Sequence, residues 1–515
     1  GMPTGYWNVQ ENLGRIPPGE NRWLTQRRLH IRDLDDDAVT TVENVDHPEL
    51  LFGDTLWTAD GSTLVVAGSL PSVLEGRQHP LYEYSAGTAL LRFSPEGAKL
   101  GLWSRPGFDD AGTSFLPLDG TRLLANSPTN TTRHLHIVDL AAPDAAAQPV
   151  YTGHSYPSGV VYNGGTLVGT FLDVTDPGEL RYGAVGNDNA PITSSTLTTV
   201  TDLNAGPRDA SGLAYEVISY TTSAGVPVEG LYIYPKTWSL TPPTARPVVV
   251  WQAGGPGGQM TNTWGTSVES PYSLLPAFGI PVFVVNGSGR NSNGAAFYSA
   301  MADGRNYGQR DIRDVKEGVD ALIAKGYVNP AAVGVTGCSY GGYFSLQSIV
   351  EFPDFYAASN AQCSLNDMMY EYNFGWSPFL AYLLGNSPTG DPAEFVRDSP
   401  TYNVGKMRTP LLLFHGTSDF LFFESITNIH DQLELQGVPT RFFRGIGYGH
   451  GIGGIQGVPN AGPRGQRAAF QLQLEWFRAH LPGAAGPALF GALADRLRPI
   501  VGRPGLPLPQ LTEVR

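Results

Sequence analysis

The pattern of hydrophobic and polar positions divides the chain near residue 208. Before that point, short apolar runs rich in β-branched residues alternate with turn signals, and there is almost no helical periodicity. Such runs predict strands joined by tight turns. The clearest are residues 29–34, 63–68, 89–93, 122–126, 134–140 and 166–171. We therefore expect residues 2–208 to form an all-β domain.

Three stretches of this domain repeat one arrangement: a turn with glycine, an apolar strand, a polar gap and a second strand with an acidic end. They begin near Asp60, Asp119 and Asn163. This spacing is loosely that of a propeller blade, about 40–50 residues. The pattern alone fits a β-sandwich as well, so both architectures remain open here. A propeller of this length would have roughly four or five blades.

After residue 208, strands alternate with helices. Residues 214–221 and 230–235 predict an antiparallel pair, and the later apolar runs are continuous, as in a parallel sheet covered on both faces. These runs are 247–252, 280–286, 331–337, 356–361 and 409–416. Helical periodicity predicts helices over 311–326, 342–352, 425–437 and 467–481. We expect one α/β domain over 209–482, followed by a Gly-, Pro- and Leu-rich tail over 483–515.

Composition and charge narrow the classes of function. The 515 residues include 41% hydrophobic residues, and 33 Lys+Arg stand against 47 Asp+Glu, for a formal net charge of −14. An acidic surface repels phosphate groups, which disfavours nucleic-acid partners and docking on anionic membranes. No apolar run reaches about 18 residues, so we expect no transmembrane helix. The sequence does not indicate an oligomeric state.

The N-terminus lacks the basic segment and apolar core of a secretory signal. Gly1 before Met2 looks like a residue left by cloning. We expect a cytoplasmic protein if Met2 is the native start, and a secreted one if a leader was removed.

The strongest chemical signal is Gly337-Cys338-Ser339-Tyr340-Gly341-Gly342. It fits G-x-S-x-G, a sharp strand-to-helix turn that presents a serine at a sheet edge. An apolar strand precedes it and a helical pattern follows it, as the motif requires. We therefore predict Ser339 as a nucleophile.

A serine nucleophile needs a general base and a carboxylate that orients the base. In this type of fold they follow the serine in the order Asp, then His. Asp419 follows the apolar strand at 411–414, and His450 lies in the glycine-rich loop Gly447-Tyr448-Gly449-His450-Gly451. We predict His450 as the base and Asp419 as its partner. Two backbone donors must also hold the developing oxyanion. We expect these to be the amides of Tyr340 and of Gly255, in the Gly-rich loop after residue 252.

These motifs together resemble the prolyl oligopeptidase (S9) family of serine peptidases, nearest the acylaminoacyl-peptidase and dipeptidyl-peptidase branches. The resemblance covers most of 209–482, in the family's order. It implies an α/β fold: a C-terminal α/β-hydrolase domain with an N-terminal all-β, shortened β-propeller-like cap. It also implies cleavage of short peptides admitted between the domains, with no cofactor and no metal.

The chain departs from the family pattern at three places. The family's propeller usually has seven or more blades, more than residues 2–208 can supply. The acylaminoacyl branch commonly has His where Ala253 stands. The dipeptidyl branch uses a glutamate pair in the propeller, whereas this region offers only Glu83 as a lone candidate, which is better explained as a solvated strand residue.

In the family, a segment that follows the helix after the serine turn lines the S1 pocket with aromatic side chains. The resemblance therefore implies substrate binding by an apolar slot, although aromatic residues more often belong to a core. The candidates are Tyr340, Tyr370, Tyr372, Phe374 and Trp376.

Cys338 and Cys363 are expected at the ends of adjacent parallel strands. A bridge is geometrically conceivable, but we expect two buried free thiols. Altogether the sequence predicts a serine peptidase that acts on short peptides through an acyl-enzyme. The alternative is an esterase or acyl-transferring hydrolase with a small acyl substrate from specialised metabolism, because the same triad serves esters and amides.

Overall fold

The computed structural model describes the chain in twelve segments. They are residues 30–42, 55–58, 60–69, 88–103, 114–119, 121–142, 145–186, 189–301, 306–421, 423–453, 461–484 and 511–514. Glu83 and most of the predicted tail lie outside the described residues. None of the helices within these segments is both long enough and apolar enough to cross a membrane.

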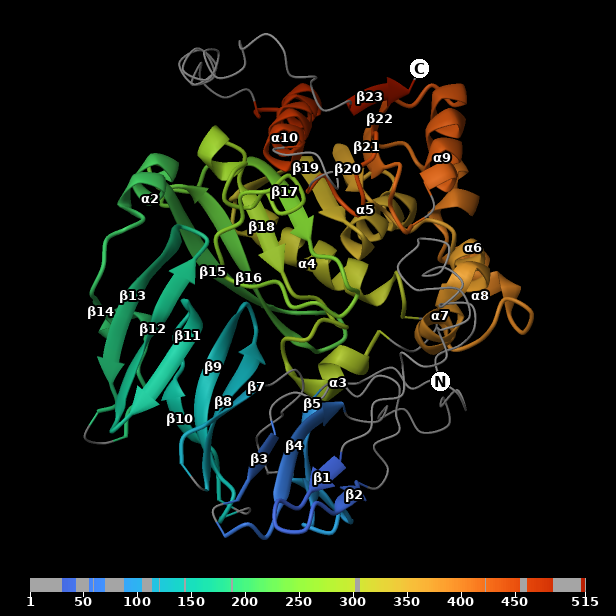
Figure 1. Ribbon diagram of the computed structural model, residues 1–515. Coiled ribbons are helices and arrows are strands. Elements are labelled where there is room, and N and C mark those ends of the chain that lie inside the picture. The colour runs from blue at the N-terminus through green and yellow to red at the C-terminus, as the bar shows by residue number, and fades with distance from the viewer. Residues whose placement is uncertain are drawn as a thin grey trace.

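The N-terminal part of the chain is all-β, as its apolar runs predict (Figure 1). It contains three antiparallel sheets of four strands, each built from four consecutive strands, and one two-stranded sheet. The two-stranded sheet is β1 (His30–Arg32) and β2 (Val39–Thr41). The first four-stranded sheet is β3 (Thr55–Trp57), β4 (Leu64–Ser69), β5 (Thr88–Phe93) and β6 (Lys99–Trp103). The second is β7 (Ser114–Pro117), β8 (Arg122–Thr129), β9 (Thr132–Asp139) and β10 (Gln148–Tyr151). The third is β11 (Tyr156–Asn163), β12 (Thr166–Asp173), β13 (Asp176–Ala184) and β14 (Thr198–Thr199).

Helix α2 (Ala205–Ser211) leads from these sheets into a nine-stranded mixed sheet. Its strand order is β15-β16-β18-β17-β19-β20-β21-β22-β23. The six central strands, β17 to β22, run parallel to one another. The predicted antiparallel pair β15/β16 is confirmed at one edge. The bounds are β15 (Leu213–Thr221), β16 (Pro227–Pro235), β17 (Arg246–Gln252), β18 (Val282–Val285), β19 (Val328–Cys338), β20 (Ala358–Gln362), β21 (Leu411–Gly416), β22 (Thr440–Gly445) and β23 (Leu511–Val514). The last strand shows that the end of the predicted tail joins this sheet, antiparallel to β22.

Helices cover both faces of this sheet, which explains its continuous apolar strands. The predicted helices are confirmed as α4 (Arg310–Ala324), α5 (Tyr340–Glu351), α9 (Phe423–Leu435) and α10 (Ala461–His480). Apolar side chains of α4, α5 and α9 share one buried cluster with the sheet, and those of α10 belong to the cluster on the other face. Shorter helices are α3 (Gly294–Ser299), α6 (Met368–Glu371), α7 (Ser377–Leu384) and α8 (Pro392–Arg397).

One hairpin of the β domain is hydrogen-bonded directly to the α/β domain. The turn between β8 and β9 places Asn130 at a positive φ of 50°. The Asn130 N–H donates to the Ser292 carbonyl at 2.8 Å, and its carbonyl accepts from the side-chain amides of Gln259 (3.0 Å) and Asn286 (2.8 Å). The turn therefore ties together two loops that come from different strands of the large sheet.

Asn262 provides a second link between the domains. Its side chain is fully buried, accepts the Val174 N–H at 2.9 Å and donates to the His154 carbonyl at 2.9 Å. Both partners belong to the β domain, so one buried amide satisfies two backbone groups that would otherwise lack partners at this contact.

We expect Asn262→Ala to destabilise the whole chain. The substitution leaves the buried Val174 N–H without its acceptor, at a cost of about 1–3 kcal/mol, and it also removes the part-buried bond to the His154 carbonyl. Thermal unfolding followed by circular dichroism should show a lower Tm. Asn163→Ala, at the exposed end of β11, is the matched control and should change the free energy of unfolding by less than about 0.5 kcal/mol. Equal Tm values for both variants would contradict this account of the contact.

Candidate active site

Ser339 lies at the turn from β19 into α5, as predicted. Its backbone has φ 63° and ψ −123°, a conformation that L-residues rarely adopt. The turn is possible because glycines flank it: a Cβ on Gly337 or Gly341 would clash with the Gln252 carbonyl at the end of β17. The close approach of these backbones fixes the serine at the carboxyl edge of the central strands.

Asp419 and His450 form a hydrogen-bonded pair at the same edge. Asp419 follows β21 and His450 lies in the loop after β22, and Nδ1 of the imidazole is 2.9 Å from Oδ1 and 3.1 Å from Oδ2 of the carboxylate. The carboxylate is fully buried, whereas the His450 side chain is 27% exposed. The pair therefore presents a partly accessible imidazole whose Nδ1 is held by a buried acceptor.

The loops that carry this pair are bonded to each other. The Ser418 N–H donates to the Tyr448 carbonyl at 2.9 Å, and the Gly447 N–H donates to Thr417 Oγ1 at 2.9 Å. Gly416 is required at the end of β21, because a Cβ there would clash with the carbonyls of the histidine loop. The position of the imidazole is thus set by backbone contacts.

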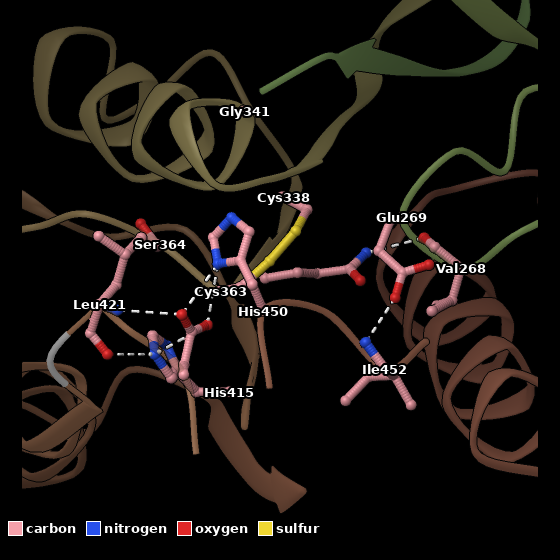
Figure 2. Close-up of a disulfide and its surroundings, with 12 residues drawn as sticks. Val268, Glu269, Cys338, Gly341, Cys363, Ser364, His415, Leu421, His450 and Ile452 are labelled. Atoms are coloured by element: carbon pink, nitrogen blue, oxygen red, sulfur yellow. Dashed lines mark hydrogen bonds and ion pairs between the residues drawn. A yellow bond between two sulfur atoms is a disulfide. The ribbon is translucent and has the colours of Figure 1, made fainter. Parts of the chain in front are cut away.

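A second histidine, His415, lies next to the Asp419 carboxylate (Figure 2). It is buried, and its Nε2 lies 3.2 Å from the Leu421 carbonyl and 3.5 Å from Asp419 Oδ2. Because a carbonyl only accepts, Nε2 carries the proton. Burial lowers the pKa of His415, so the ring is neutral. The Leu421 N–H also donates to Asp419, at 3.0 Å.

The glycine-rich loop after β17 lies against Ser339. A Cβ on Gly254 would be 3.1 Å from Ser339 Cβ and 3.6 Å from its Oγ. The predicted donor Gly255 is the next residue of this loop. Tyr340, the other predicted donor, is the first residue of α5, and amides in the first turn of a helix have no partner within the helix.

Arg290 holds this loop from within the core, a role that the sequence did not predict. Its buried guanidinium donates to the Gly254 carbonyl at 3.0 Å and to Gln252 Oε1 at 3.3 Å. It also lies over the ring of Tyr340, with 5.2 Å between its Cζ and the ring centroid. Nothing local in the Asn-Gly-Ser-Gly-Arg run at 286–290 indicates burial of its arginine.

The Tyr340 ring does not line an open pocket. It is completely buried, stacks among Tyr307 and Tyr343, and donates its hydroxyl to Asp311 Oδ2 at 2.6 Å. The part of Tyr340 beside the serine is therefore its backbone amide, and its ring supports the elbow from inside.

The other predicted pocket residues belong to the segment from α6 onward. Tyr370 and Phe374 stack with ring centroids 5.0 Å apart, and Tyr372 packs edge-on against Phe395 at 5.5 Å. Phe374 is 39% exposed. The side chain of Trp376 lies outside the described residues.

Phe420 is an aromatic contact of the imidazole that the sequence analysis missed. Its ring lies 4.3 Å from that of His450, centroid to centroid. Phe420 and Tyr372 pack against the same hydrophobic cluster. Its position directly after Asp419 was the available signal.

The expectation of free thiols is wrong. Cys338 and Cys363 form a disulfide, with Cα atoms 5.3 Å apart. Cys338 pairs with Gln362 in the parallel ladder, so Cys363 comes just beyond its neighbour at the same sheet edge. The bridge lies beside the imidazole (Figure 2): both sulfurs and a ring nitrogen of His450 are within 4.8 Å of one another. Within the part of the chain that the structure describes, no hydrogen bond joins Ser339 Oγ to His450.

Residues 266–483, which contain Ser339, Asp419 and His450, match the prolyl oligopeptidase family. The matched residues are less than half of the chain, and they lie within the α/β domain. An uncharacterized peptidase YuxL of Bacillus subtilis is 26% identical over 270 residues, which are 52% of this chain and 39% of the relative. The human acylamino-acid-releasing enzyme is 25% identical over 271 residues, 50% of this chain and 34% of the enzyme. The chain thus spans well under half the length of these relatives.

A solved structure extends the likeness to most of this chain. The Pyrococcus horikoshii acylaminoacyl peptidase superposes with a TM-score of 0.65 at 18% identity, covering 89% of this chain and 67% of that one. At this identity the likeness concerns the fold. The fold is therefore a C-terminal α/β-hydrolase domain with an N-terminal all-β domain.

The buried Asp311 makes stability depend on pH. Burial raises its pKa from 3.8 to about 6, against the opposing effects of the Tyr340 hydroxyl and the Arg290 charge. Between about pH 4 and pH 6 the folded chain keeps a proton that the unfolded chain has released. The contribution of this group to stability therefore falls as the pH rises through that window.

We expect Asp311→Asn to remove this dependence. The amide oxygen still accepts from Tyr340, but the side chain no longer titrates. Between pH 4 and pH 7 the wild type should lose up to about 3 kcal/mol more folding free energy than the variant, since one pKa unit corresponds to about 1.4 kcal/mol. Urea unfolding at four pH values measures this difference. Parallel profiles would show that Asp311 titrates as it does in the unfolded chain.

Proposed function

We propose that this protein is a serine peptidase that hydrolyses short peptides through an acyl-enzyme on Ser339. The observation that carries the proposal is the Asp419–His450 pair at the sheet edge where the elbow presents Ser339. The family match supports the same reaction class, and the human relative's name describes release of acylated amino acids.

In this proposal each group has one role. Ser339 Oγ attacks the scissile carbonyl, and Nε2 of His450 takes its proton and passes it to the leaving amine. Asp419 keeps the other ring proton on Nδ1 and stabilises the imidazolium. Water activated by His450 then releases the acid. The missing Ser339–His450 hydrogen bond is compatible with this role, since such bonds often tighten only when substrate is bound.

The oxyanion would be held by the amides of Tyr340 and Gly255. The Gly254 backbone lies against Ser339, and Arg290 anchors that loop through the Gly254 carbonyl. A fixed loop costs no reorganisation when charge develops on the substrate oxygen.

We propose that the segment with Tyr370, Tyr372, Phe374 and Trp376 walls the pocket for the residue before the cleaved bond. The exposed Phe374 and its stacked partner Tyr370 offer apolar surface. Phe420 connects this region to the imidazole, because it packs on His450 and on the same cluster as Tyr372.

We propose further that the three four-stranded sheets are blades of a shortened propeller. Each is an antiparallel meander of consecutive strands, which is how a blade is built. As a cap hydrogen-bonded to the catalytic domain at Asn130 and Asn262, such an array would limit substrates to short peptides.

The test compares the wild type with Ser339→Ala on a mixed peptide library, with products identified by mass spectrometry. We expect turnover to fall roughly 10³-fold or more while the Tm is unchanged, because only the nucleophile is removed. Ser195→Ala, an exposed serine of the β domain, serves as the control and should cleave as the wild type does. The cut positions report the pocket preference.

Two results would contradict the proposal. Equal cleavage by the wild type and Ser339→Ala would remove Ser339 from the reaction. No cleavage by the wild type, together with labelling of Ser339 by a fluorophosphonate, would mean a competent nucleophile that acts on another acyl substrate.

A further inference from the structure

We propose that Cys338, Cys363 and His450 form a zinc site when the disulfide is reduced, and that Zn²⁺ bound there blocks hydrolysis. The inhibitory step rests on the proposed role of His450 as the base. The metal site itself rests only on the three side chains and their surroundings.

The two sulfurs are held together by the backbone as well as by their bond. The Ser339 N–H donates to the Gln362 carbonyl at 3.0 Å, and the Cys363 N–H donates to the Phe414 carbonyl at 2.8 Å. Both cysteines also lie at the ends of paired strands. These contacts persist after reduction, so the two thiols stay adjacent.

The donor set suits zinc. Two thiolates and one imidazole are a known combination for Zn²⁺, which binds Cys sulfur at about 2.3 Å and His nitrogen at about 2.0–2.1 Å. Ligand sulfurs on a tetrahedral ion lie about 3.8 Å apart, which follows from the Zn–S length. Both sulfurs and an imidazole nitrogen already lie within 4.8 Å of one another. Opening of the S–S bond frees both cysteine side chains to rotate, which the approach to these separations requires.

The surroundings of His450 are those of a zinc ligand. A metal-bound histidine usually donates its other ring N–H to a carboxylate, which fixes the tautomer and makes the free nitrogen more basic. Asp419 occupies that place at Nδ1, at 2.9 Å. The nitrogen left for a metal is Nε2, the same atom that takes the proton from Ser339 in the proposed reaction. The partial exposure of His450 leaves room for water as a fourth ligand.

The redox step balances with a dithiol as the reductant. The dithiol gives two electrons and two protons to the S–S bond and becomes a disulfide, and Cys338 and Cys363 become thiols. Zn²⁺ then displaces both thiol protons to solvent. Cys338 is only half-buried, so a reductant can reach it. Thiols are kept reduced in the cytoplasm and oxidised outside it, so the availability of this site depends on the redox state of the surroundings.

The experiment uses the full chain, oxidised or reduced with a dithiol that is removed before Zn²⁺ is added. Zinc bound after equilibrium dialysis is measured by mass spectrometry of the metal. We expect one additional equivalent on the reduced protein. Since these are the only two cysteines of the chain, protection of both from N-ethylmaleimide by Zn²⁺ reports their ligation directly. Zinc binding of equal strength to both forms would overturn the site.

Activity is read as the rate of Ser339 labelling by a fluorophosphonate. Zinc should slow labelling of the reduced chain at least tenfold, leave the oxidised chain unchanged, and be reversed by a chelator. Cys363→Ala should lose both the binding and the inhibition. If that variant does not fold, reduced wild type alkylated at both thiols replaces it. Zinc ligation by the thiols without slower labelling would overturn the part of the proposal that involves His450.

A variant of Asp419 distinguishes zinc ligation that includes His450 from zinc binding by the two thiols alone. Asp419→Asn should weaken zinc binding to the reduced chain about 10- to 100-fold, as for other carboxylate partners of ligating histidines. Unchanged affinity would mean that His450 is not a ligand. Failure of the proposed function would appear separately, as absent labelling of the oxidised, zinc-free wild type, while dialysis would still report the metal site.

Discussion

The structure of the site depends on one close contact, the approach of the elbow backbone to the end of β17. Gly337 and Gly341 lie so close to the Gln252 carbonyl that neither position tolerates a Cβ. This contact lets the chain turn from strand to helix within one residue. As a result, Ser339 adopts an unfavourable φ of 63°. The position of this turn sets the positions of the serine, the Tyr340 amide and the disulfide on the preceding residue. The glycine-rich loop packs against the same turn.

The same region shows how a buried charge can fix a loop at the sheet edge. Arg290 is buried, but it donates hydrogen bonds to backbone carbonyls of the glycine-rich loop and lies over the Tyr340 ring. The Tyr340 hydroxyl in turn donates to Asp311. Removing a charge from water is expensive unless partners replace the water. The cost is offset here by bonds that fix the loop, so the core and the sheet edge form one hydrogen-bonded unit.

The sequence was most informative where local pattern and fold agree. The parallel strands and the helices α4, α5, α9 and α10 were predicted because continuous apolar runs and helical periodicity are local signals, and the Ser, Asp and His positions follow from strand ends. Contacts of side chains inside the core were not predicted: burial of the Tyr340 ring depends on Asp311, which is distant in sequence. Cys338 and Cys363 were correctly expected at adjacent strand ends, but whether the thiols are joined depends on the positions of their side chains. Phe420 follows Asp419 directly, but an aromatic residue at that position does not by itself indicate contact with His450.

The turn at Asn130 has a consequence for how this architecture can vary in length. Its bonds reach Ser292, Gln259 and Asn286, in loops that flank the catalytic edge. Among the described residues, the strands β3 to β6 of the first four-stranded sheet make no hydrogen bond to the α/β domain. Loss of a sheet such as this one leaves the hydrogen bonds of the Asn130 turn in place, whereas a change in the turn itself alters them. A β domain that is hydrogen-bonded to its neighbour at a few residues can change its number of sheets over evolutionary time while those bonds are preserved.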